Sequence, residues 1–96
     1  MAKGYWFFQA TVRDMETYKK YIAADRVSFE KFGARYLVRG GEHQIVEGKA
    51  RDRQVVIEFD SYEQALACYH SPEYQAAAKF RFASADSDVV IVKGVD

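Results

Sequence analysis

The sequence has a single cysteine, Cys68, so no disulfide can form within the chain and the fold needs no oxidising compartment. It also carries no net charge, because 14 basic side chains balance 14 acidic ones. Without a positive field or a cluster of basic residues, we expect no nucleic-acid partner. No apolar run approaches the length of a membrane-spanning helix, and the opening residues lack the apolar core of a signal peptide. We therefore expect a cytoplasmic protein with no membrane partner.

Aromatic residues, in contrast, are abundant, at 16% of the 96 residues. The length predicts a single domain that spans residues 1–96. A chain of this size buries about two thirds of its unfolded surface. Burial of aromatic side chains must therefore supply much of the stability.

Four segments have the aromatic and β-branched composition that is typical of strands. They are residues 4–12, 34–39, 53–59 and 89–92. Residues 44–47 form either a short extension or the return of a hairpin. The first and last strands are apolar on both faces, whereas an antiparallel strand with one wet face should alternate more cleanly.

The first helix is predicted between the first two strands, over residues 15–32. Asp14 can cap its N-terminus, and Gly33 provides the usual C-terminal signal. Its apolar stripe is interrupted, because Asp25 lies near the centre of the stripe and Arg26 near its edge.

The second helix follows the third strand. Ser61 and Gln64 fit a capping box, in which Ser61 bonds the amide of Gln64 and the Gln64 side chain reaches back. Ser71 and Pro72 break this helix and restart it, because serine suits a cap and proline a first helical position. Residues 84–87 are predicted to be a polar connection to the last strand.

This order, β-α-β-β-α-β, predicts an α+β fold of the ferredoxin-like type, with an antiparallel four-stranded sheet that carries its helices on one face. The other sheet face would then be apolar and bare, which is an aggregation hazard. We therefore expect a homodimer that packs sheet face against sheet face.

Several segments together resemble the DUF1330 family. They are RGG at 39–41, EG at 47–48, VVIEF at 55–59, YHSPEYQ at 69–75 and VVIVKG at 89–94. The resemblance covers almost the whole chain, and it implies a dimeric α/β barrel, in which two ferredoxin-like subunits pack through their sheets. It also implies a ligand cavity between helices and sheet, since many superfamily relatives have one. Those relatives include small monooxygenases and isomerases, but no shared activity is established for the family itself.

Two residues are candidate catalytic groups. Glu58 is the one carboxylate in an apolar strand, and burial could raise its pKa enough to make it a general base. Its alternative role is a structural salt bridge, for which Arg81 is the partner that we favour. His70 lies beside the helix break and could move protons at a pocket mouth, although a surface histidine is the simpler interpretation.

The candidate ligand-binding residues are Arg39, Tyr69, Tyr74, Arg81, Asp25 and Arg26. Arg81 or Arg39 could hold an anionic group, and Tyr69 and Tyr74 are either core residues or the lining of an aromatic pocket. Asp25 and Arg26 could point into a cavity. Equally, Asp25 could bond a neighbour while Arg26 extends to solvent.

We predict no metal site and no cofactor, because the two histidines and the single cysteine form no close ligand pair. Two functions remain open. One is a cofactor-independent enzyme, of the monooxygenase or isomerase type, that acts on a small aromatic or acidic molecule. The alternative is a non-catalytic dimeric domain that binds a ligand or only assembles.

Overall fold

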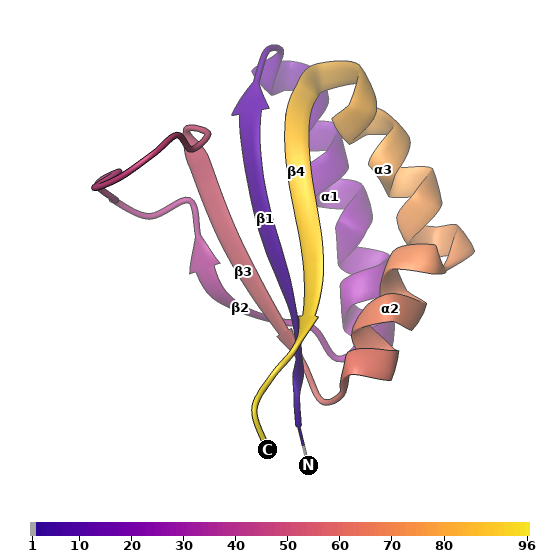
Figure 1. The fold of residues 1–96 in the computed structure, drawn as a ribbon. Coiled ribbons are helices and arrows are strands. Elements are labelled where there is room, and N and C mark those ends of the chain that lie inside the picture. The colour runs from indigo at the N-terminus through magenta and orange to yellow at the C-terminus, as the bar shows by residue number, and fades with distance from the viewer. Residues whose placement is uncertain (1) are drawn as a thin grey trace.

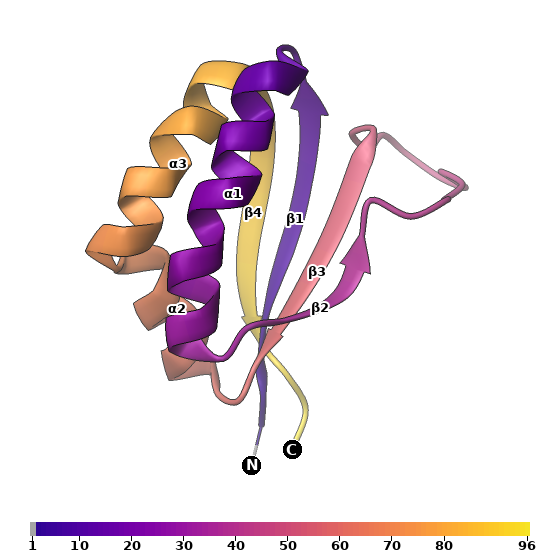
Figure 2. The same ribbon diagram turned by 180° about the vertical axis from the view of Figure 1, so that it is seen from behind.

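The computed structural model describes residues 2–96, which form one four-stranded sheet with three helices on one of its faces (Figure 1; Figure 2). The elements are β1 (Gly4–Val12), α1 (Met15–Phe32), β2 (Arg35–Arg39), β3 (Arg53–Phe59), α2 (Tyr62–His70), α3 (Pro72–Ser84) and β4 (Ala85–Lys93). The strand order is β2-β3-β1-β4, and every neighbouring pair is antiparallel. This confirms the predicted ferredoxin-like arrangement and the break in the second helix.

The predicted helix ends are confirmed by their capping bonds. The Asp14 side chain accepts a hydrogen bond from the amide of Thr17 at 3.3 Å, and Gly33 ends α1 in the left-handed region, at φ 69°. Ser71 separates α2 from α3, and its hydroxyl oxygen accepts the amide of Tyr74 at 3.1 Å. These bonds satisfy backbone groups that a helix end would otherwise leave open.

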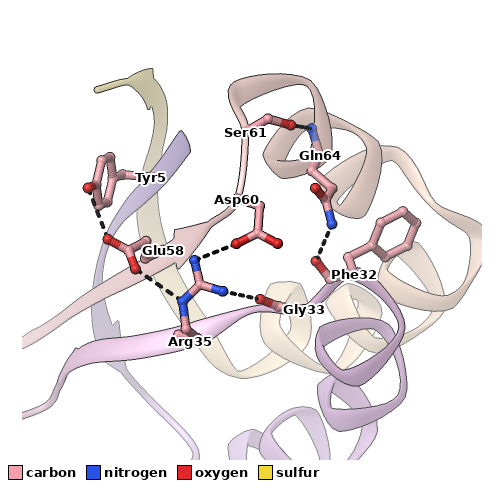
Figure 3. Close-up of polar contacts among 8 residues, drawn as sticks. All are labelled: Tyr5, Phe32, Gly33, Arg35, Glu58, Asp60, Ser61 and Gln64. Carbon is pink, nitrogen blue, oxygen red and sulfur yellow. Dashed lines mark hydrogen bonds and ion pairs between the residues drawn. The ribbon is translucent and has the colours of Figure 1, made fainter. Parts of the chain in front are cut away.

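The capping box at the start of α2 is only half formed. The amide of Gln64 donates to the Ser61 hydroxyl at 3.1 Å, as predicted. The Gln64 side chain, however, donates to the carbonyl of Phe32 at 3.0 Å instead of reaching back (Figure 3). That carbonyl lies at the end of α1, where it has no partner within its own helix. A tertiary contact thus replaces the local one.

Two predictions about connections are wrong. Residues 44–47 form no strand but belong to an exposed loop between β2 and β3, which projects away from the body (Figure 1). Residues 84–87 form no polar connection, because α3 runs directly into β4 at Ala85. Strand β4 is longer than predicted because it pairs with β1 along its whole length, from Val12 opposite Ala85 to Gly4 opposite Lys93.

The core lies between the helices and the sheet. Trp6 of β1 is fully buried there and donates its indole N–H to the carbonyl of Ala65 at 2.9 Å. Its ring packs edge-on against Phe29 and Tyr74, at centroid distances of 5.4 and 4.9 Å. This aromatic packing joins β1 to α1 and α3.

The opposite sheet face is uncovered, as the two-sided apolar strands predicted. Phe7 lies at its middle, between its register partners Val56 and Val90, and is 48% exposed. Val90 is 56% exposed.

None of the helices in residues 2–96 is both long and apolar enough to cross a bilayer.

Candidate ligand-binding groove

A groove opens between α1 and the edge of the sheet formed by β2. Its volume is about 190 Å³. It is lined by Ile22, Asp25, Arg26, Phe29, Glu30, Ala34, Tyr36 and Arg39. The groove thus combines apolar surface with charged groups of both signs.

The groove continues inward as a narrow recess. Ile22, Asp25, Tyr36 and Arg39 line both spaces, and the recess adds Phe8, Tyr18, Tyr21, Arg53, Val55 and Ile57. Its volume is about 10 Å³, so it has room for about one water molecule. Groove and recess therefore form one site whose polar side chains come from α1, β2 and β3.

Asp25 is the buried carboxyl of this site. It projects from the middle of α1 and is 3% exposed, which agrees with its predicted place in the apolar stripe. Burial raises the pKa of its carboxyl to about 7, although nearby positive charge, chiefly Arg39, and the Tyr36 hydroxyl favour the ionised form. A carboxyl with this pKa can both accept and donate a proton near neutral pH.

Arg39 reaches the groove because of an irregularity in β2. Tyr36 pairs with Ile57 and Arg39 pairs with Val55, so the four residues 36–39 of β2 lie opposite the three residues 55–57 of β3. Ile57 and Val55 both face the helices, and the extra residue therefore turns Tyr36 and Arg39 to that same face. The guanidinium of Arg39 stacks on the Tyr36 ring, with its central carbon 4.2 Å from the ring centre.

Arg53, at the start of β3, also lines the recess beside Asp25. Its guanidinium carbon is 5.8 Å from the centre of the Tyr18 ring, and its Nε is buried without a hydrogen-bond partner. The guanidinium also packs against Gly40, where a Cβ would collide with it. Gly40 thus lets a charged side chain approach the backbone at the end of β2.

Arg26 was predicted at the edge of the stripe, and it lies there, exposed at the rim of the groove. Tyr74 and Tyr69 belong instead to the aromatic core, where their ring centres are 5.3 Å apart. Tyr74 is fully buried, and its hydroxyl is 2.8 Å from that of Tyr21. Burial raises the pKa of Tyr74 to about 12, so it stays protonated at neutral pH.

Arg81 is 3% exposed, and it lies within this aromatic core instead of lining the groove. Its guanidinium carbon is 5.2 Å from the centre of the Phe8 ring and 5.7 Å from that of Tyr21. Its Nε and Nη2 have no hydrogen-bond partner among residues 2–96. Contacts with aromatic rings take the place of a carboxylate partner.

The favoured pairing of Glu58 with Arg81 is wrong. Glu58 lies on the uncovered face of the sheet, opposite the helices, between its register partners Tyr5 and Arg35 (Figure 3). Its carboxylate accepts hydrogen bonds from Arg35 Nε and from the Tyr5 hydroxyl, both at 3.0 Å. These bonds lower the pKa of Glu58, which is opposite to the shift expected of a general base. Arg35 also pairs with Asp60, at 3.0 Å.

His70 is exposed at the end of α2, and its ring packs edge-on against Tyr69 at 5.3 Å. It lies outside the groove lining. The structure therefore brings Asp25, Arg26 and Arg39 together and leaves Glu58 and His70 elsewhere.

Three lining residues of the recess were not predicted from the sequence as site residues: Tyr18, Tyr36 and Arg53. Tyr18 lies on the same buried face of α1 as Asp25, about two turns before it. Arg53 begins its strand, where an arginine is usually solvated. Within residues 2–96, no group of three or more potential metal ligands comes together.

Comparisons with known proteins agree with this architecture. A family model described as a domain of unknown function, DUF1330, matches residues 3–95. A crystal structure of RPA0582, a protein of unknown function from Rhodopseudomonas palustris, superposes with a TM-score of 0.79 at 19% identity, covering 99% of this chain and 84% of that one. No curated protein matches the chain.

Two other solved structures have the same fold. SnoaB from Streptomyces nogalater, a cofactor-independent oxygenase, superposes with a TM-score of 0.62 at 11% identity, with 100% and 96% of the two chains covered. A dimeric protein of unknown function with a ferredoxin-like fold, from Bacteroides fragilis, has a TM-score of 0.54 at 16% identity and coverages of 96% and 94%. At these identities the likeness concerns the fold.

Proposed function

The chain belongs to the DUF1330 family, and from that premise we propose that its groove binds a small aromatic or acidic organic molecule with which Asp25 exchanges a proton. The observation that carries the proposal is the burial of the Asp25 carboxyl at the floor of an open groove. A buried carboxyl is costly unless it is paired, and Asp25 forms no ion pair within residues 2–96. Perturbed, unpaired groups of this kind concentrate at functional sites.

The shape of the groove supports a ligand of about single-ring size. Its volume of about 190 Å³ lies below the roughly 300–1,000 Å³ of pockets for drug-sized molecules. The side chains of Ile22, Phe29 and Tyr36 offer apolar and aromatic surface for the body of the ligand. Arg39 would hold an anionic group at the mouth.

Cofactor-independent chemistry of the monooxygenase or isomerase type is the reaction class that we propose. Such an enzyme must move protons with its own side chains, and Asp25 has the pKa for this task. The fold shared with SnoaB, a cofactor-independent oxygenase, is an analogy that motivates this class. Glu58 and His70, the catalytic groups chosen from sequence, have no part in the proposed mechanism.

We further propose that the protein is a homodimer joined through the uncovered sheet faces. The row of half-buried Val56 and exposed Phe7 and Val90 supports this assembly, because an apolar sheet face of this kind is rarely left to solvent. A cytoplasmic location stays a prediction.

The alternative function is a non-catalytic dimeric domain. The observation that favours it is the Tyr21–Tyr74 hydroxyl pair, since these two phenols satisfy each other's hydrogen bonding.

The test is a screen of single-ring aromatic and acidic molecules by two-dimensional amide NMR, with wild type and Asp25→Asn compared. We expect shift changes centred on residues of α1 and β2 that line the groove, with weaker or pH-independent binding in Asp25→Asn. Changes confined to other surfaces would contradict the proposal. Binding without any turnover, or without an effect of Asp25→Asn, would favour the non-catalytic alternative.

A further inference from the structure

The charges around the groove are unbalanced. Every other arginine of β2 and of the segment before β3 has a carboxylate partner: Arg35 pairs with Glu58 and Arg51 pairs with Asp88, at 3.0 and 2.7 Å. Arg39 and Arg53, the two that line the recess, take part in no ion pair within the described part of the chain. Two guanidinium groups therefore face a site that contains one buried carboxyl, Asp25.

Both guanidinium groups are held in place by contacts that do not use their charge. Arg39 stacks on the Tyr36 ring, and no hydrogen bond within residues 2–96 engages its N–H groups. Arg53 is placed between the Tyr18 ring and the backbone of Gly40, with a buried Nε that lacks a partner. Stacking of this kind orders an arginine side chain and leaves its N–H edge available to an anion.

The two guanidinium groups come to one side of the sheet through separate backbone features. The extra residue between Tyr36 and Val38 turns Arg39 toward the helices. The positive φ of Gly40, 68°, together with its missing side chain, makes space for Arg53. Both features place positive charge beside the recess.

We propose that Arg39 and Arg53 form a clamp for a carboxylate, so that the ligand of the groove is a small organic acid with an apolar or single-ring body. This inference rests on the proposed function, because it names the ligand class of the same groove. The carboxylate lies at the mouth of the recess that both arginines line, and the body of the ligand lies in the groove on Ile22 and Phe29. A compact inorganic anion lacks the apolar part that this surface requires.

The test compares the binding of aromatic acids with that of the corresponding neutral amides. Benzoate and 3-phenylpropionate are titrated into the full chain and followed by calorimetry and amide NMR, beside benzamide and 3-phenylpropionamide of the same shape. The acids are expected to bind in the groove about tenfold to a hundredfold more tightly than the amides, which is the usual range for charged hydrogen bonds. Inorganic phosphate is expected to bind more weakly than either acid.

Arg39→Gln removes one arm of the clamp and should remove most of the preference for acid over amide. Arg39→Lys keeps the charge but not the planar fork of N–H donors, so this variant should retain only part of the preference for acid over amide. Arg13→Gln is the matched control, because Arg13 pairs with the exposed Asp86 away from the groove. Because Arg39 is exposed, these variants are expected to fold, and amide spectra confirm this before titration.

Failure of the clamp can be distinguished from failure of the proposed function. Amides that bind in the groove as tightly as the acids would overturn the clamp and leave a binding groove in place. Phosphate that binds more tightly than the acids would overturn the organic-acid class. Shift changes from none of the probes would overturn both the clamp and the groove as a binding site.

Discussion

The guanidinium carbon of Arg39 lies 4.2 Å from the centre of the Tyr36 ring, although the two residues are three apart on one strand. In a regular strand, residues at this spacing point to opposite faces. The extra residue in β2 brings them together beside Asp25 and thereby joins a charge, a ring and a buried carboxyl at one groove. A local irregularity in the sheet thus creates most of the polar part of the site.

The first prediction concerns the dependence of stability on pH. The pKa of Asp25 is about 7 in the folded chain and 3.8 as the ordinary value, so folding favours the protonated form. Its stabilising contribution is complete below pH 4 and is lost as the pH rises through 7, by at most about 4 kcal/mol. Denaturant unfolding of the wild type between pH 5 and 8 should show this loss.

Asp25→Asn should remove that loss and exceed the wild type in unfolding free energy at pH 8. Asp86→Asn is the control, since Asp86 is exposed and should leave the profile unchanged. Parallel profiles of wild type and Asp25→Asn from pH 5 to 8 would contradict the assignment.

The second prediction concerns Gly40, for which the chain offers a matched partner. Gly40→Ala and Gly48→Ala both place alanine at a positive φ, 68° and 73°, and each should cost about 1 kcal/mol of stability. Only at Gly40 does the added Cβ meet Arg53, whereas nothing lies near Gly48. Gly40→Ala should therefore also weaken benzoate binding, and equal affinity in the two variants would show that Arg53 does not take part.

The third prediction concerns the uncovered sheet face. Phe7→Lys places an ammonium group in the middle of the Val56–Phe7–Val90 row and should convert the proposed dimer into a monomer. Val27→Lys is the control, because Val27 is 61% exposed on α1 and not on the sheet. Light scattering at micromolar concentration is the measurement, and a wild-type monomer would contradict the proposed assembly.

The fourth prediction concerns Glu58. Glu58→Gln weakens the bonds to Arg35 and Tyr5 and should lower the unfolding free energy. Asp60→Asn, at the exposed partner of the same arginine, should cost less than about 0.5 kcal/mol. If Asp60→Asn lowers the unfolding free energy as much as Glu58→Gln does, the Arg35–Glu58 pair is not the stronger of the two.

Much of the fold could be predicted because local signals agree with it. The ends of α1 follow from Asp14 and Gly33, and the restart at Ser71 follows from the serine–proline pair. The failures lie where tertiary contacts decide. Gln64 bonds the end of α1 instead of its own cap, and β4 is lengthened by the strand with which it pairs.

The candidate site was only partly predictable for the same reason. Helical periodicity placed Asp25 on the buried face of α1, and the structure agrees. Pairing between strands is not readable from alternation alone, so Glu58 was matched with Arg81, which lies across the sheet from it. The extra residue in β2, which turns Arg39 toward the groove, has no signature in the sequence.

The most direct test of this account is the pKa of Asp25 in the ligand-free protein, followed by NMR through its side-chain carboxyl carbon. We expect a midpoint near 7, because the carboxyl is buried in the groove and forms no ion pair within residues 2–96. A midpoint near 4, the ordinary value for an aspartate, would contradict the role of Asp25 as the proton-exchanging group.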